Sequence, residues 1–136
     1  MKIPSILVCA GSLVAAMAAV PSAHHSAAAY EPATIVLKNA TVKSLVWANP
    51  HSILAFDVLD DAGASAAWTA ESGSPSALTR MGWTRNSVRA GDRVTIELFP
   101  ARNGAKVGRL AKVVLADGRE LLDSMGTEGS VGKPAP

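Results

Sequence analysis

The sequence is short of cysteine, of aromatic residues and of net charge. Its one cysteine, Cys9, lies in the apolar N-terminal stretch, so the rest of the chain has no thiol and can form no disulfide. Aromatic residues make up only 4% of the chain, which favours their use in the core over an extended stacking surface. The 13 Lys and Arg residues barely exceed the 11 Asp and Glu residues. We therefore expect no nucleic-acid binding, which needs a clustered basic excess.

The N-terminal residues have the pattern of a cleavable secretory signal. Met1 and Lys2 supply a basic start, and the stretch 3–20 is uncharged and mostly apolar or small. A membrane anchor needs about 20 apolar residues. This stretch approaches that length, but it is rich in Ala and Gly and runs into Pro21. We predict that residues 1–23 are removed, which leaves a periplasmic or secreted protein that is not embedded in the membrane.

The remaining chain is long enough for one domain. The cleavage position has three candidates, which are after Ala18, Ser22 or Ala23. The last two start the mature chain at or beside a histidine pair. We place a single β-barrel domain at 24–123. Residues 124–136 are rich in Gly, Ser and Pro, which is typical of a disordered tail.

Residue patterns predict a mostly β domain with one short helix. Alternating and β-branched segments separated by turn residues predict strands over 34–47, 53–59, 65–70, 93–99, 109–115 and 120–122. Ser74 and Pro75 form a helix-start signature. Leu78 and Met81 then share one helix face, and Gly82 ends the helix.

Three strands, a short helix and further strands are the element order of the OB-fold. We therefore predict an all-β, small OB-fold-like β-barrel with the helix between strands three and four. An open sandwich or roll with the same strands is the alternative. Closure of a barrel removes exposed sheet edges, which suits an exported monomer.

Short motifs recur in a fixed order along the chain. They are HHS at 24–26, WANPH at 47–51 (with NPH at its end), GSPSAL at 73–78, RMGW at 80–83, AGD at 90–92 and PAR at 100–102. In this ordered set the chain resembles an uncharacterised family of small exported bacterial proteins, a domain of unknown function, over about 24–122. The resemblance implies export and a small β domain, and it supplies no activity. Ala29 and Ser52 depart from the larger residues of that family, which loosens packing near the histidines.

All three histidines fall at two places, His24 with His25 and then His51. Imidazole is the commonest side-chain metal ligand, and Cu(II) heads the affinity order of the divalent ions. A cut after Ala23 allows the new amine and the His24 ring to chelate one ion, which His51 completes. A cut after Ser22 instead places a histidine third from the amine, an arrangement that binds Cu(II) in a square plane. We expect Asn49 to orient His51 from outside the ligand shell.

The same residues also have simpler interpretations. The histidine pair can be plain polar residues, and His51 can cap a turn. Trp47 and Trp83 form a possible ligand face or part of the core. Ser72 and Ser74 lack a nucleophile motif and a paired base, so we predict no enzyme.

The sequence therefore favours an exported, periplasmic β domain that binds a small ligand, with Cu(II) as the leading ligand. The alternative is a non-catalytic structural or protein-interaction module of the cell envelope that binds no metal. An envelope protein would then be the partner.

Overall fold

The computed structural model describes residues 27–124. The predicted signal, His24, His25 and the chain after residue 124 lie outside the described residues. In order, the elements are a 3-10 turn (Ala27–Ala29), β1 (Ile35–Val46), β2 (Ile53–Leu59), β3 (Ser65–Glu71), α1 (Pro75–Arg80), β4 (Arg93–Pro100), β5 (Val107–Val114) and β6 (Glu120–Leu122). The six strands and the helix begin and end within two residues of the predicted bounds, whereas the 3-10 turn was not predicted.

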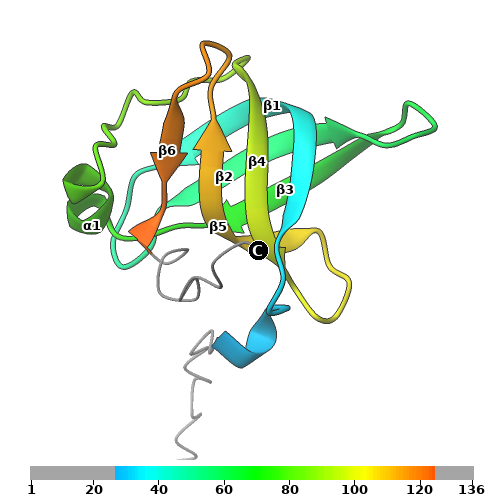
Figure 1. Ribbon diagram of the computed structural model, residues 1–136, viewed down its shortest axis with the longest axis horizontal. Helices are drawn as coiled ribbons and strands as arrows, with labels where there is room; N and C mark the ends of the chain where they lie inside the picture. Colours follow the sequence, from blue (N-terminus) through cyan, green and yellow to red (C-terminus); the bar gives the residue numbers. More distant parts are fainter. Residues whose placement is uncertain (1–26, 125–136) are drawn as a thin grey trace, which may run out of the picture.

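The strands form a closed five-stranded barrel (Figure 1). The sheet order is β3-β2-β1-β4-β5-β6, and a further parallel pairing of β3 with β5 closes the barrel. All other pairings are antiparallel. The helix lies between β3 and β4, so the predicted OB-fold-like barrel is confirmed. β6 is an addition that pairs only with β5.

β1 takes part in both halves of the barrel because it is bent. Its start pairs with β4, its end pairs with β2, and each pairing has a register shift. One shift falls between Leu37 and Ala40, where Asn39 has φ +55°. Asparagine is among the few residues that tolerate this left-handed conformation. A β-bulge is therefore present at 38–40, and it produces the bend that curls the sheet.

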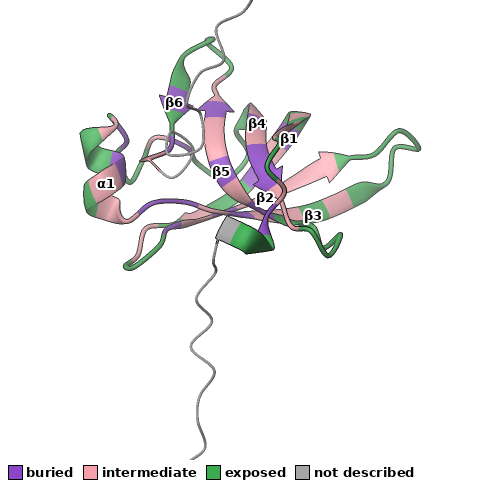
Figure 2. Cartoon of the chain, turned by 60° about the horizontal axis from the view of Figure 1, so that its bottom comes forward, coloured by how far each residue is buried: buried purple, intermediate pink, exposed green. Residues whose placement is uncertain are grey.

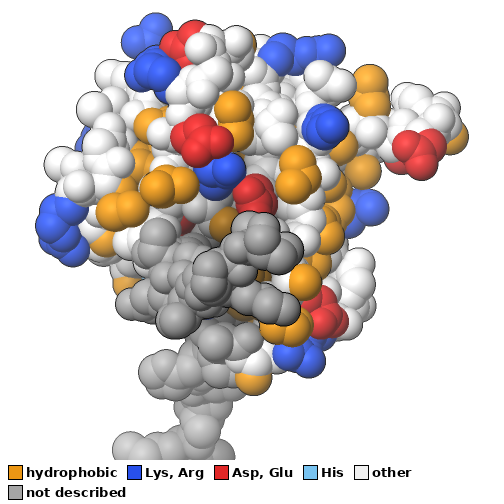
Figure 3. All heavy atoms as spheres, viewed as in Figure 1, with side chains coloured by type: hydrophobic (Ala, Val, Ile, Leu, Met, Phe, Trp, Pro, Cys, Tyr) orange, Lys and Arg blue, Asp and Glu red, His pale blue; other side chains and the backbone are white. Residues whose placement is uncertain are grey.

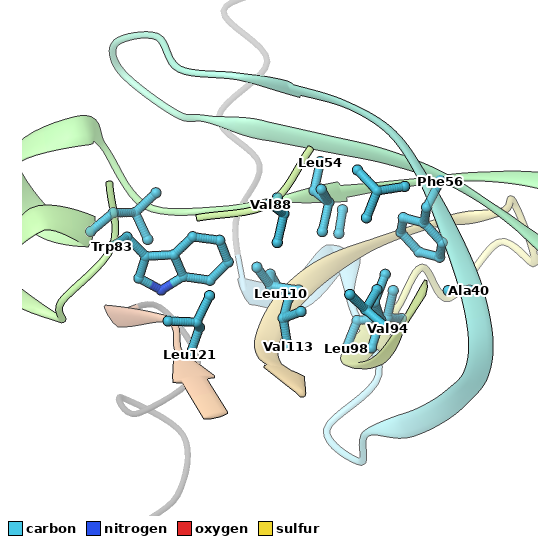
Figure 4. Close-up of a cluster of buried hydrophobic side chains, with 14 residues drawn as sticks. Ala40, Leu54, Phe56, Trp83, Val88, Val94, Leu98, Leu110, Val113 and Leu121 are labelled. Carbon is cyan, nitrogen blue, oxygen red and sulfur yellow. The ribbon is translucent and has the colours of Figure 1, made fainter. Parts of the chain in front are cut away.

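The core fills the barrel from the helix end to the opposite end (Figure 4). Ser74 caps α1 by accepting from the Ala77 amide at 3.3 Å, and Leu78 turns inward with none of its surface exposed. Trp83 follows the helix and is only 1% exposed. Buried positions alternate along β4, as Figure 2 shows for the strands in general. The helix therefore covers one end of the core.

The surface carries charges of both signs. On the face in Figure 3, basic and acidic side chains lie interspersed around the molecule. Among the described residues, five large apolar side chains are exposed, at Val36, Val46, Leu59, Val107 and Leu122. Within residues 27–124, no helix has the length and apolar character required to cross a membrane.

Candidate metal-binding site

His51 stands at the end of the loop that leads from β1 into β2. The neighbouring Ser52 fixes this loop against the segment that follows β3. The Ser52 amide donates to the Gly73 carbonyl at 3.1 Å, and the Ser72 amide donates to the Ser52 carbonyl at 2.8 Å. The backbone of His51 is thus held firmly, while 42% of its side chain is exposed.

Both nitrogens of the His51 ring lie close to oxygen atoms that accept hydrogen bonds. Nδ1 lies 3.3 Å from the carbonyl oxygen of Ser72. A carbonyl only accepts hydrogen bonds, so Nδ1 is the donor. In the neutral ring this leaves the lone pair on Nε2, which lies 3.4 Å from Oε1 of Glu71. That lone pair would then face the carboxylate, and either a proton on Nε2, which makes an ion pair with Glu71, or a metal ion would relieve the repulsion.

Glu71 is held from its other side by Tyr30. The Tyr30 hydroxyl donates to Oε2 of Glu71 at 3.0 Å. Both groups are shielded, since the Glu71 side chain is 12% exposed and Tyr30 is 7% exposed. Burial, and then the hydrogen bond and negative charge of Glu71, raise the pKa of Tyr30 to about 12, against an opposing effect of Arg109. Tyr30 therefore stays a donor, and it leaves Oε1 directed at His51.

The chain around Tyr30 is hydrogen-bonded to the end of β4 and to the loop after it. The Glu31 amide donates to the Pro100 carbonyl at 2.8 Å. Arg102 Nε donates to the Tyr30 carbonyl at 2.9 Å, and the Arg102 amide donates to the Ala29 carbonyl at 3.1 Å. The start of the described chain is thus anchored beside the His51–Glu71 pair.

A surface pocket of about 310 Å³ adjoins this pair. Tyr30 and Glu71 line it together with mainly apolar groups, among them Ile53, Ala101 and Val107. The pocket therefore gives the Glu71 carboxylate an approach from the side of the N-terminal segment.

The separation of 3.4 Å between Nε2 and Oε1 suits two ligands of one ion. Ligands about 2.0–2.1 Å from a metal are roughly 3.4 Å apart at a tetrahedral angle and roughly 2.9 Å apart in a square plane. His51 and Glu71 therefore supply two donors. Within residues 27–124, no cluster of three or more His, Cys, Asp or Glu side chains could hold a metal.

The structure describes only some of the predicted metal-site residues. His51 is exposed at the barrel end, and His24 and His25 lie outside the described residues. Asn49 is exposed, and within the described chain Nδ1 of His51 contacts the Ser72 carbonyl instead of Asn49. The role predicted for Asn49 thus passes to a backbone group, because the loop pairs with residues 72–73.

The predicted ligand face of Trp47 and Trp83 needs correction. Trp83 is buried, and its Nε1 donates to the Leu122 carbonyl at 2.8 Å. Its ring is therefore unavailable to a ligand. Trp47 is half-buried and packs against the core. Both indoles therefore contribute to the packing of the barrel, in agreement with the simpler interpretation that they are part of the core.

Glu71 and Tyr30 were missed by the sequence reasoning. A signal for Glu71 existed in the β2–β3 hairpin, whose register pairs Leu59 with Ser65 and, six residues back, Ile53 with Glu71. Counting back from the turn places Glu71 next to the loop of His51. No comparable signal in the sequence locates Tyr30, because its partners Glu71 and Arg102 are distant from it in the sequence.

The buried hydroxyl of Ser52, the residue after His51, is in an unfavourable environment. Ser52 is fully buried, and its Oγ has no hydrogen-bond partner among the described residues. An unpaired buried hydroxyl costs about 1–3 kcal/mol. We expect Ser52→Ala to raise the free energy of unfolding by about 1 kcal/mol in urea denaturation. An equal or lower stability would show that the hydroxyl is satisfied in solution.

The raised pKa of Tyr30 predicts a loss of stability at alkaline pH. The unfolded tyrosine ionises near pH 10 and the folded one near pH 12. The folded state thus keeps its proton longer, and the stabilisation, roughly 2–3 kcal/mol, is complete below pH 10 and lost between pH 10 and 12. Tyr30 is the only tyrosine, so phenolate absorbance reports it directly. Tyr30→Phe should lose less stability over this range, and equal losses would refute the assignment.

Fold and site together define a small OB-fold-like barrel with a histidine–carboxylate pair at one end. The chain belongs to the family of unknown function DUF6152, whose model matches residues 11–111. No curated protein and no solved structure matches the chain.

Proposed function

We propose that this protein is an exported, periplasmic, non-catalytic domain that binds Cu(II) through His51 and the N-terminal histidines His24 and His25. The observation that carries the proposal is the orientation of the His51 ring. Its Nδ1 is committed to the Ser72 carbonyl, and its Nε2 faces the Glu71 carboxylate at 3.4 Å. Metal-binding histidines typically donate their second nitrogen to a backbone carbonyl or carboxylate in this way.

Chain length allows the N-terminal histidines to complete the site. His25 precedes Tyr30 by five residues, and an extended chain spans at most about 3.6 Å per residue. The Cα of His25 therefore stays within about 18 Å of the Tyr30 Cα. Tyr30 itself is hydrogen-bonded to Glu71. Two further imidazoles, or one imidazole and a free amine, would raise the donor set to four.

The donor types favour Cu(II) among the divalent ions. Imidazole, amine and carboxylate are nitrogen and oxygen donors, and Cu(II) binds such sets more strongly than Zn(II). A square-planar Cu(II) needs the two described donors to approach by roughly 0.5 Å, which the exposed His51 side chain can supply by a small shift toward Glu71. Zn(II), which suits the 3.4 Å separation directly, is the rival metal.

Native mass spectrometry tests the proposal on protein recovered from the periplasm of bacteria that express the full chain. Cells are grown with added copper or added zinc, and one spectrum gives both the first residue and the bound metal. We expect a chain that starts at Ala23 or His24 and carries one copper ion. A metal-free chain, or one that carries copper equally after both N-terminal histidines are changed to alanine, would refute the proposal. The metal-free outcome would favour the envelope interaction module instead.

A further inference from the structure

The PAR motif at 100–102 lies outside the His51–Glu71 pair, and it holds the chain that follows the HHS motif. Pro100 ends β4, and its carbonyl accepts from the Glu31 amide at 2.8 Å. The Arg102 amide donates to the Ala29 carbonyl at 3.1 Å. These two bonds enclose an isolated antiparallel bridge. The N-terminal segment is therefore joined to the barrel by main-chain hydrogen bonds at this point.

The Arg102 side chain adds a third hydrogen bond to this junction. Its Nε donates to the Tyr30 carbonyl at 2.9 Å. Within residues 27–124 the side chain makes no other hydrogen bond and no ion pair. A positively charged donor makes a stronger hydrogen bond than a neutral one. Arg102 therefore supplies two of the three hydrogen bonds that join residues 29–31 to the PAR motif, and we call these three bonds the latch.

Tyr30 places the latch beside the candidate metal site. While its carbonyl accepts from Arg102, its hydroxyl donates to Glu71 at 3.0 Å. We propose that Arg102 is a positioning residue, which holds the N-terminal segment against the barrel so that the HHS motif stays close to His51. The metal part of this inference rests on the proposed function, whereas the attachment of the segment does not. Arg102 touches no metal in this scheme.

The latch shortens the free chain that carries the N-terminal histidines. His25 lies five residues before Tyr30, where the latch holds the chain, and ten residues before Ile35, where β1 begins. An open latch therefore doubles the length of the free chain. Each doubling of a flexible loop makes the meeting of its ends about threefold less favourable. Release of the latch should weaken Cu(II) binding by about this factor.

Arg102→Pro removes both hydrogen bonds of Arg102 and keeps the loop intact. Proline has no amide hydrogen and no side-chain donor. The Gly104 amide donates to the Ala101 carbonyl at 3.2 Å, which makes 101–104 a β-turn with Arg102 in its second position. Among the described residues, Asn39 is the only non-glycine residue with positive φ, so this is a type I turn. Proline is favoured at the second position of such a turn.

Backbone NMR of the metal-free mature protein measures the latch directly. In the unmodified protein we expect order parameters of about 0.85 at Tyr30 and Glu31, the value of rigid backbone. In Arg102→Pro they should fall below about 0.6, and the Glu31 amide should exchange with solvent at least about tenfold faster. Arg102→Ala keeps the main-chain donor, so it should give an intermediate result. A general loss of stability would not confine the change to this segment.

Arg119→Ala is the matched control. Arg119 is an exposed arginine in the turn between β5 and β6, where it pairs with Asp117 at 2.8 Å. Its replacement should leave the order parameters of Tyr30 and Glu31 unchanged. A folded Arg102→Pro protein in which both residues stay rigid would overturn the proposal. If Arg102→Pro does not fold, the same measurement on Arg102→Ala decides the question.

Copper titration then separates positioning from attachment. Arg102→Pro should bind Cu(II) about threefold more weakly than the unmodified protein, and this loss should be confined to proteins that retain His24 and His25. A mobile segment with unchanged copper affinity would overturn the positioning role. A mobile segment in Arg102→Pro, when the unmodified protein binds no copper, would uphold the attachment by Arg102 and refute only the proposed metal function.

Discussion

Replacement of His51 with alanine is expected to weaken Cu(II) binding by at least about 100-fold. Loss of groups that merely orient a metal-binding histidine already costs about 10–100-fold, so loss of the ligand itself should cost more. The substitution removes the Nε2 ligand atom. The Glu71 carboxylate then keeps only the hydrogen bond that it accepts from Tyr30. Competition titration of the mature protein against a chelator of known affinity measures the change. Electron paramagnetic resonance should also show one nitrogen ligand fewer.

Asn49→Ala is the matched control for His51→Ala. Asn49 is exposed in the same loop, two residues before His51, and the Ser72 carbonyl takes the orienting role predicted for it. Its replacement should leave Cu(II) affinity within about twofold, since surface changes of this kind usually alter free energies by less than 0.5 kcal/mol. Unchanged affinity in His51→Ala would mean that the N-terminal residues bind copper alone, as any peptide with such a start does.

Replacement of Trp83 with alanine is expected to lower the free energy of unfolding by about 3–5 kcal/mol. The indole is 1% exposed, and it packs between α1 and β6 at the helix end of the core (Figure 4). Its removal leaves a large cavity and strands the Leu122 carbonyl without its 2.8 Å donor. A loss of this size is a large fraction of the stability of a small domain. Urea denaturation followed by far-ultraviolet circular dichroism measures it.

Two further tryptophan variants separate the causes of this loss. Trp83→Phe keeps most of the apolar volume and removes the Nε1 donor, so it should cost about 1–2 kcal/mol. Trp47→Ala should cost clearly less than Trp83→Ala, because Trp47 is only half-buried against the core. Equal losses for Trp47 and Trp83 would contradict the burial that distinguishes them.

Local patterns were sufficient for the strands and the helix. Residues with unusual backbone preferences marked the boundaries, such as Pro75, whose φ is fixed, at the helix start and Gly63, which tolerates φ +79°, in the hairpin turn. Such effects act within a few residues, so a single sequence displays them. The order of these elements then favoured an OB-fold-like barrel over an open sandwich or roll. The parallel β3–β5 pairing, which closes the barrel, confirms this prediction.

The candidate site could be predicted only in part. A histidine next to a turn is visible in the sequence, and His51 was identified in that way. The partners of its ring were not, because Glu71 and Ser72 lie about twenty residues away and meet it only through the register of β2 with β3. Asn49 was chosen as a neighbour in sequence, but the loop directs the ring toward the opposite segment.

The sequence by itself determined the element order, the expected export signal, the absence of cysteine after Cys9 and the scarcity of ligand-type side chains. These properties depend on composition and on contacts between near neighbours, which any single chain reveals. Only the tertiary structure decided that Trp83 is core, that Tyr30 donates to Glu71, and that the Asp123 carboxylate accepts from Ser72. Each of these depends on residues about 40 to 50 positions apart. Their meeting is fixed by barrel closure, which brings distant strands together.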